Sequence, residues 1–154
     1  AYSSTVDYPS YRVIKRNGET THFDKVKIND TLQRAAHGLA CVDLERIQKE
    51  LLRNIYDGIT TEVLEKALVL SVIAFLEFDP EYDVLASRLL LQIAYKEVFG
   101  CSTTQEDRHA KYRQSFAKSI KAGIENGILN DALLSYDLEA LAAHIEPERD
   151  QLFT

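Results

Sequence analysis

The chain has 154 residues, of which 45% are hydrophobic and 27% are charged, and its formal net charge is −6 at pH 7. These values are typical of a globular protein of one domain, or of one small domain and part of another, and they argue against a disordered chain. No run of about 18 apolar residues is present, so we expect no membrane-spanning helix. The N-terminus also lacks the basic and apolar segments of a secretory signal peptide.

The two cysteines, Cys41 and Cys101, are far apart in the sequence. They do not form a C-x-x-C pair, so we expect neither a zinc site nor a disulfide framework. The expected location is a reducing, cytoplasmic compartment.

A β-hairpin is predicted after a flexible tail formed by residues 1–10. Its strands are Arg12–Lys15 and Glu19–Phe23, joined at Asn17-Gly18, where both residues accept the positive φ of a type I′ turn. Residues 11–28 carry five cationic and two acidic side chains, a net charge of +3. A positive cluster at a hairpin and a helix start suits phosphate. By charge alone, ordinary solvated lysines are the simpler interpretation.

Four helices are predicted to follow the hairpin. The first ends near Gly38 and the second at Gly58, where glycine favours a C-terminal stop. The third, from Glu62 to about Phe78, is apolar on nearly all sides and should lie in the middle of a bundle. The fourth ends at Gly100. The predicted N-caps are Asp24, Asp43, Thr60 or Thr61, and Asp79.

Further helices are predicted after a polar break at residues 101–104. They cover about 105–126, 131–135 and 137–145, and a final turn starts at Glu146-Pro147. This part has few large apolar residues, so we expect it to belong to something larger. The expected fold class is α+β, mostly α, with a small β-hairpin lid on four helices. The expected divisions are 1–10, 11–100 and 101–154.

Five ordered blocks of the sequence resemble the ATP-cone, the nucleotide-sensing domain at the N-terminus of many ribonucleotide reductase large subunits. Residues 101–154 are similar to the segment that follows the cone in those subunits. The resemblance implies that residues 11–100 form the cone and that residues 101–154 begin the helical N-terminal region of a class I large (α) subunit. The blocks are Val13-Ile14-Lys15-Arg16-Asn17-Gly18 with Phe23-Asp24 and Lys27-Ile28, Tyr56-Asp57-Gly58-Ile59-Thr60-Thr61, Asp79-Pro80-Glu81-Tyr82, Leu85-Ala86-Ser87-Arg88-Leu89, and Tyr95-Lys96.

The resemblance implies an allosteric domain that binds ATP or dATP, with Mg²⁺, and sets the overall activity of ribonucleoside-diphosphate reductase in deoxyribonucleotide synthesis. In the family, ATP keeps the enzyme active and dATP shifts it into an inhibited oligomer. The implied partners are the nucleotide, the rest of the large subunit, the radical-generating small subunit and further copies of the chain, but neither DNA nor a membrane.

The chain itself is expected to be regulatory and to carry no catalytic residue. Reduction in the family requires a thiyl radical and a redox-active cysteine pair, which Cys41 and Cys101 do not supply. We therefore interpret the chain as a regulatory piece of a larger enzyme, either a fragment or the product of a split gene.

Nine residues are candidates for contacting the nucleotide. The four cations suit a triphosphate, although Lys96 would also complement a helix C-terminus. The two aliphatic residues would line an adenine pocket or belong to the core. The two threonines would contact the ligand, or serve only as a strand residue and an N-cap. The candidates are Val13, Lys15, Arg16, Thr21, Lys27, Ile28, Thr61, Glu65 and Lys96.

Glu65 departs from the family pattern, because some cones have a histidine at this position. Either Glu65 binds Mg²⁺ or a ribose hydroxyl, or the pocket is arranged differently, and the number of nucleotides bound stays open. Two alternatives remain. One is a degenerate cone that binds no nucleotide and serves as an oligomer contact. The other is a cone of a transcriptional repressor, which the absence of paired cysteines before the cone disfavours.

Overall fold

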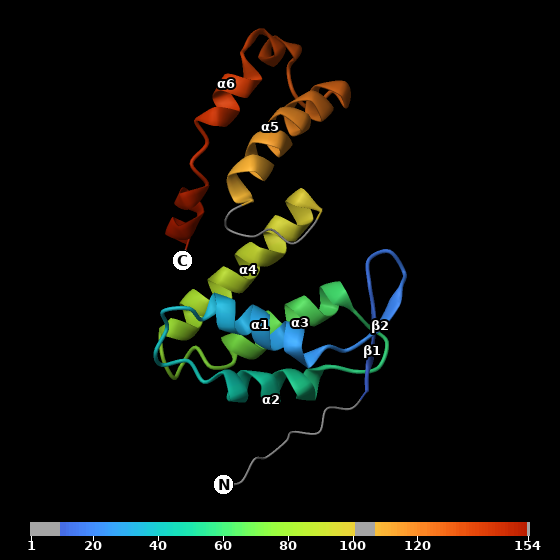
Figure 1. The fold of residues 1–154 in the computed structure, drawn as a ribbon, viewed down its shortest axis with the longest axis vertical. Helices are drawn as coiled ribbons and strands as arrows, with labels where there is room; N and C mark the ends of the chain where they lie inside the picture. Colours follow the sequence, from blue (N-terminus) through green and yellow to red (C-terminus); the bar gives the residue numbers. More distant parts are fainter. Residues whose placement is uncertain (1–9, 101–106, 154) are drawn as a thin grey trace. The chain divides into compact units, whose positions relative to one another are not determined.

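The structure is a computed structural model that describes residues 10–100 and 107–153 (Figure 1). The chain divides into two compact units, Ala1–Leu90 and Leu91–Thr154, and the division falls within helix α4 (Glu81–Phe99). The predicted tail, apart from Ser10, and the predicted polar break at 101–104 lie outside the described residues.

The first unit contains a three-stranded sheet in the order β2-β1-β3. Strand β1 (Arg12–Ile14) pairs antiparallel with β2 (Thr20–His22) and parallel with β3 (Ile59–Thr60). The predicted hairpin is confirmed, with each strand shorter than expected. The third strand was not predicted, because two residues are too few to show the alternation that marks a strand.

The turn of the hairpin differs from the predicted type I′ turn. Gly18 has a φ of 83°, but Asn17 does not have a positive φ, and a type I′ turn requires positive φ at both central residues. Gly18 N donates to Lys15 O over 2.9 Å, and Lys15 N donates to Glu19 O over 2.8 Å. The connection is therefore a three-residue loop that ends in a left-handed glycine. Asn17 contributes its side chain instead, since its Oδ1 accepts a hydrogen bond from Glu19 N.

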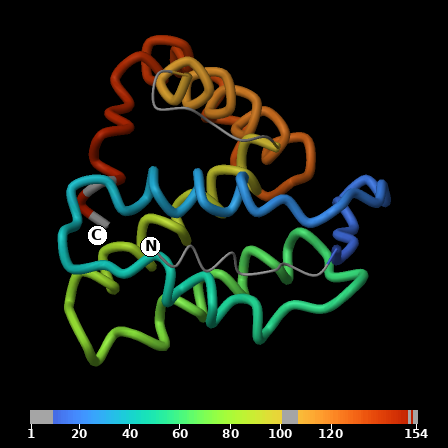
Figure 2. The backbone as a smooth tube through the Cα atoms, turned by 60° about the horizontal axis from the view of Figure 1, so that its bottom comes forward, coloured from blue at the N-terminus to red at the C-terminus, as the bar shows by residue number. Residues whose placement is uncertain are grey.

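Helices α1 (Lys25–Ala35), α2 (Leu44–Asn54) and α3 (Thr61–Ile73) complete most of the first unit, and the hairpin projects from one end of them (Figures 1 and 2). The predicted N-caps of α1, α2 and α3 are confirmed. The Asp24 and Asp43 side chains each accept two backbone N–H groups, and Thr60, rather than Thr61, caps α3 by accepting from Val63 N. These caps satisfy backbone donors that have no partner within the helix.

Helix α3 is shorter and less enclosed than predicted. It ends at Ile73, and residues 74–78 form turns. One side of α3 is buried, but Leu70 on the opposite side is 63% exposed and Ile73 is 40% exposed. The prediction of a helix surrounded on all sides is wrong, because the described part of the chain covers only one side of α3.

The core of the first unit lies between these helices and the start of α4. Leu32, Ile47 and Leu85 are fully buried. Arg88 on α4 donates to Ala35 O and His37 O, each over 2.8 Å, and so satisfies carbonyls at the C-terminal end of α1.

The second unit is built from the rest of α4, α5 (Arg108–Glu125), η1 (Asp131–Ser135), α6 (Leu138–Ala143) and η2 (Pro147–Phe153). These elements follow the predicted order, although η1 and η2 are 3₁₀ helices. Helix α5 packs against α6. A Cβ added to Gly123 of α5 would lie 2.6 Å from the Leu129 side chain, so this glycine allows the chain after α5 to fold back closely.

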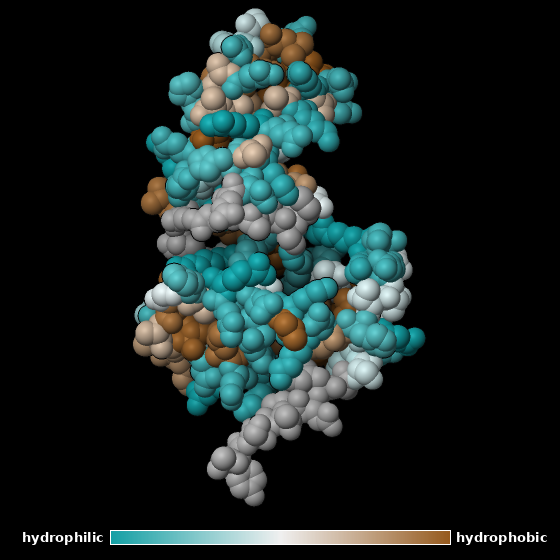
Figure 3. Space-filling view, in the orientation of Figure 1, coloured by the Kyte–Doolittle hydropathy of each residue, from teal (hydrophilic) through white to brown (hydrophobic). Residues whose placement is uncertain are grey.

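The fold class is α+β and mostly α, as predicted, and residues 10–100 and 107–153 contain six α-helices and one small sheet. Among the helices that the structure describes, none combines the length and apolar character needed to cross a bilayer. Figure 3 shows apolar residues on the visible face in separate patches among hydrophilic ones, as is usual for a protein surface in water.

Candidate functional site

Two faces of the sheet place the strand residues of the predicted site. Val13 pairs with Thr21 on β2 and with Ile59 on β3, so these three side chains lie on one face. Val13 and Ile59 are buried and Thr21 is half-buried. This face therefore belongs to the interior of the first unit. Val13 lies in the core, and its predicted contact with adenine stays a prediction.

The two cations Lys15 and Arg16 lie in the loop between β1 and β2, where both are exposed. Lys15 Nζ lies 2.9 Å from Glu19 Oε2, and this contact lowers the pKa of the Glu19 carboxyl below its ordinary value. The cation of Arg16 contributes to a lowered pKa of Glu62, where the larger cause is Lys66. The structure thus places both loop cations near carboxylates.

The N-terminus of α3 lies beside this loop. Ile14, the last residue of β1, pairs with Thr60 of β3, and Thr61 Oγ1 donates to Ile14 O over 3.3 Å. Helix α3 begins directly after β3, so its positive end lies at the end of β1 where Lys15 and Arg16 follow. Thr61 ties the helix start to the strand and is not the N-cap.

The start of α1 supplies the next two candidates, Lys27 and Ile28. Lys27 is exposed, with its Nζ 3.9 Å from Asp24 Oδ2, while Ile28 is half-buried. Helix α1 begins at Lys25, directly after β2 and the Asp24 cap. Since β1 spans only about 7 Å, α1 and α3 begin within a short distance of the same strand.

The last two candidates belong to different units. Glu65 lies in the second turn of α3 and is half-buried. Lys96 lies in the last turn of α4, within the second unit. Apart from Lys96, the predicted site residues all come from elements that meet around β1.

An ion pair that was not predicted lies at the start of β1, between Arg12 and Asp57. Arg12 forks onto the carboxylate of Asp57 through Nε and its terminal nitrogen, and Arg12 N donates to Asp57 Oδ1 over 2.8 Å. Gly58 N donates to Arg12 O. These contacts lower the pKa of Asp57 to about 2, chiefly through the Arg12 side chain. The only sequence signal was the position of Asp57 in the Tyr56-Asp57-Gly58 turn.

The family described as the ATP cone domain matches residues 11–97, more than half of the chain. The chain belongs to the ATP-cone family. The match includes the sheet, the loop of Lys15 and Arg16, and the starts of α1 and α3. Membership indicates that this part of the chain is a nucleotide-binding regulatory domain.

Several bacterial relatives resemble the chain beyond the cone. The ribonucleoside-diphosphate reductase subunit alpha of Chlamydia pneumoniae is 28% identical over 146 residues, which is 94% of this chain and 14% of that protein. The subunit of Helicobacter pylori is 31% identical over 142 residues, 92% of this chain and 17% of that protein. The reductase 1 subunit alpha of Escherichia coli is 26% identical over 143 residues, with coverages of 92% and 18%. The chain thus spans less than a fifth of these relatives.

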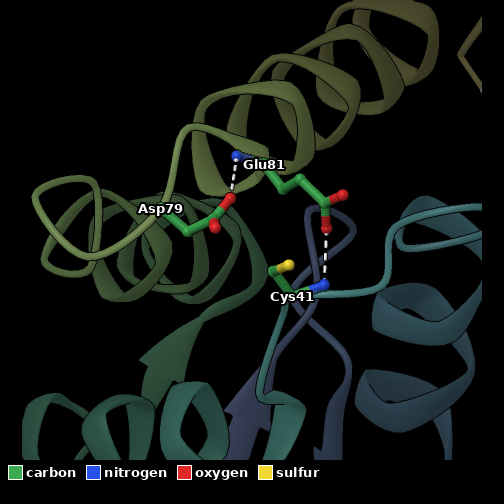
Figure 4. Close-up of side chains that lie close together, drawn as sticks. All are labelled: Cys41, Asp79 and Glu81. Atoms are coloured by element: carbon green, nitrogen blue, oxygen red, sulfur yellow. Dashed lines mark hydrogen bonds between the residues drawn. The ribbon is translucent and has the colours of Figure 1, made fainter.

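A second cluster in the cone joins the loop after α1 to the start of α4 (Figure 4). One atom each from Cys41, Asp79 and Glu81 lie within 4.8 Å of one another. Glu81 Oε2 accepts from Cys41 N over 2.6 Å, and Asp79 Oδ1 accepts from Glu81 N over 2.8 Å. The two carboxylates raise the pKa of the Cys41 thiol, Asp79 most strongly. Metal binding requires the thiolate, so these contacts favour a structural tie between the two segments.

The second unit contains a partly buried polar cluster of its own. Tyr95 on α4 and Tyr112 on α5 both donate to the Asp150 carboxylate on η2. The Arg108 guanidinium lies 4.8 Å from the centre of the Tyr95 ring. Burial is the main cause that raises the pKa of Tyr95 and that of Tyr112, the latter to about 12. Both hydroxyls therefore stay protonated at neutral pH and hold η2 against the two helices.

Proposed function

We propose that this chain is the ATP- and dATP-sensing domain that controls the overall activity of a ribonucleoside-diphosphate reductase, and through it deoxyribonucleotide synthesis. The single observation that carries the proposal is the ATP-cone match over residues 11–97. The matched part contains the cationic loop, residues 15–19 between β1 and β2, which includes Lys15 and Arg16. The similarity to reductase α subunits over 94% of the chain supports the kind of enzyme it regulates.

Phosphate recognition is assigned to the loop between β1 and β2. Lys15 and Arg16 supply point and forked positive charge, and the N-terminus of α3 adds backbone donors and the positive end of a helix dipole. Lys27 on α1 supplies a third cation within the first unit. The phosphate contact of Lys96, which belongs to the second unit, stays a prediction. Mg²⁺ would accompany the triphosphate, as it usually does for bound nucleotides.

Base and ribose recognition is assigned to less exposed residues. Val13 and Ile28 would contact the adenine with aliphatic surface. Thr21, Thr61 and Glu65 would supply polar contacts, and Glu65 would accept from a ribose hydroxyl or bind the metal. Distinguishing ATP from dATP requires one hydroxyl to be sensed, and an unpaired buried polar partner costs about 1–3 kcal/mol. ATP and dATP can therefore be distinguished without a large change in the pocket.

The chain is proposed to act on a larger assembly and not to catalyse reduction itself. Its partners would be the rest of the large subunit, the radical-generating small subunit and other copies of the chain, which dATP would bring into an inhibited oligomer. A second candidate is a degenerate cone that binds no nucleotide and serves as an oligomer contact. The exposed apolar side chains of Leu70 and Ile73 on α3 favour it.

Titration calorimetry with ATP and dATP in the presence of Mg²⁺ separates the two candidates. The sensor gives saturable heat with both nucleotides, and Lys15→Glu removes it because a phosphate-binding cation becomes an anion. Lys49→Glu, which makes the same charge change on the exposed side of α2, is the matched control and retains binding.

Circular dichroism checks that Lys15→Glu keeps its helices. Wild-type protein without heat or thermal shift from either nucleotide would contradict the sensor and favour the degenerate cone. Unchanged affinity in a folded Lys15→Glu variant would contradict the phosphate assignment alone.

A further inference from the structure

The cationic loop carries its own counter-ion. Lys15 Nζ lies 2.9 Å from Glu19 Oε2, and both side chains are about half exposed to solvent. The same carboxylate oxygen lies 3.5 Å from Asn17 Nδ2. Glu19 is therefore held by a cation and an amide of the same loop.

Backbone geometry keeps this carboxylate in place. Asn17 Oδ1 accepts from Glu19 N over 3.0 Å, and Glu19 O accepts from Lys15 N over 2.8 Å. The left-handed Gly18 brings the chain back so that residues 15 and 19 face each other. The Lys15–Glu19 contact is thus a product of the loop shape.

A second carboxylate interacts electrostatically with Arg16, the other loop cation. Glu62, in the first turn of α3, pairs with Lys66 over 2.7 Å. The pKa of Glu62 is lowered mainly by Lys66, and the cation of Arg16 adds to this effect. The positive charge offered by the loop and the α3 N-terminus is therefore partly neutralised from both sides.

We propose that Glu19, supported by Glu62, is an internal counter-anion of the nucleotide site that competes with the ligand phosphates for Lys15 and Arg16. This inference rests on the proposed nucleotide function and assigns a role to two residues outside the predicted site. Before the nucleotide binds, Glu19 forms an ion pair with Lys15. A bound triphosphate takes its place, and the released carboxylate lies close to the bound anion.

The expected effect is a raised concentration threshold for nucleotide binding. An exposed ion pair contributes little, so its loss on binding weakens affinity by only about threefold. Removing the carboxylate also raises the net positive charge of the site, so ligand affinity should fall more steeply with added salt in its absence.

The test measures ATP affinity by calorimetry for Glu19→Gln, with inorganic tripolyphosphate as a second ligand that lacks the base and ribose. Glu19→Gln should bind both ligands about threefold more tightly than wild type, and Glu62→Gln should show a smaller gain. Glu45→Gln is the matched control, because it removes the same charge at a position away from the loop. Glu45 lies in the first turn of α2, and the other end of this helix, about 15 Å away, is the one that leads to β3.

A double-mutant cycle separates the specific contact from net charge. In the Lys15→Gln background, Glu19→Gln should lose most of its gain, because the cation it competes for is absent. An equal gain in both backgrounds, or an equal gain from Glu45→Gln, would overturn the counter-anion role while leaving nucleotide binding intact.

The remaining outcomes distinguish this inference from the proposed function. If wild type binds neither ligand but Glu19→Gln binds both, the native chain is not a sensor under those conditions and Glu19 is the reason. If neither protein binds either ligand, both proposals are overturned.

Discussion

Single residues hold the ends of β1 in place. At the start of the strand, Arg12 and Asp57 join segments 45 residues apart. At its end, Thr61 donates to Ile14 O. Together these contacts fix the start of α3 against the hairpin, which is the geometry the proposed phosphate site needs. Arg12 and Asp57 act here by positioning other residues.

The Arg12–Asp57 pair predicts a pH-dependent contribution to stability. The pKa of Asp57 is lowered from 3.8 to about 2 in the folded protein, so the ionised carboxyl favours folding. This contribution is present above the unfolded pKa and is lost as the pH falls from about 4 to about 2. Asp57→Asn should lower the melting temperature by a few degrees at pH 7, and the difference from wild type should shrink as the pH approaches 2.

Thermal melts between pH 7 and pH 2 measure this difference. Asp30→Asn, the same change at an exposed position of α1, is the control and should shift the melting temperature less at pH 7. A difference between wild type and Asp57→Asn that stays constant over this range would show that the ionised carboxyl is not the cause.

The site residues were only partly accessible from the sequence. Lys15 and Arg16 belong to a sequence motif that the family shares, so the sequence was enough to predict them as site residues. The sequence did not predict which carboxylates these cations contact. The Lys15–Glu19 contact depends on the loop shape, and the Arg12–Asp57 contact depends on the pairing of β1 with an unpredicted strand.

At the scale of elements, the hairpin loop depends on one backbone conformation. Gly18 has a φ of 83°, and a Cβ at this position would meet no atom within 4 Å. A substitution here therefore acts through backbone strain without a steric clash. Because the loop presents Lys15 and Arg16, this strain also affects the proposed site.

Gly18→Ala should destabilise the protein by about 1 kcal/mol, the usual cost of a left-handed conformation for a residue with a Cβ. Gly18→Asn is the matched comparison and should cost less, because asparagine tolerates this region better. Chemical denaturation followed by circular dichroism measures both variants. Equal stability of the alanine and asparagine variants would contradict the strain argument.

Helix starts were easier to predict than helix ends and short strands. Asp24 and Asp43 cap their helices through side chains that accept backbone N–H groups two and three residues later. This interaction is local, so the sequence alone is sufficient to predict where the helix starts. The end of α3 was misplaced because its apolar pattern continues to Phe78 while the chain turns after Ile73. Strand β3 exists only through its pairing with β1, a contact between distant segments that local patterns do not reveal.

At the scale of the whole molecule, the chain consists of two compact units. The first contains the sheet, the cationic loop and a core around Leu32 and Leu85. The second contains the Tyr95–Asp150–Tyr112 cluster that fixes η2. The ATP-cone match ends at residue 97, while the similarity to reductase subunits continues over nearly all of the chain. The proposed regulation therefore begins in the first unit and is exerted on protein beyond it.

The most direct test of nucleotide sensing by the loop is an NMR titration of the ¹⁵N-labelled chain with ATP in the presence of Mg²⁺. If the account is right, backbone amide shifts change in a saturable way and are largest at residues 15–19 and 60–62, where the loop meets the start of α3. No change at millimolar ATP, or changes confined to other segments, would contradict it.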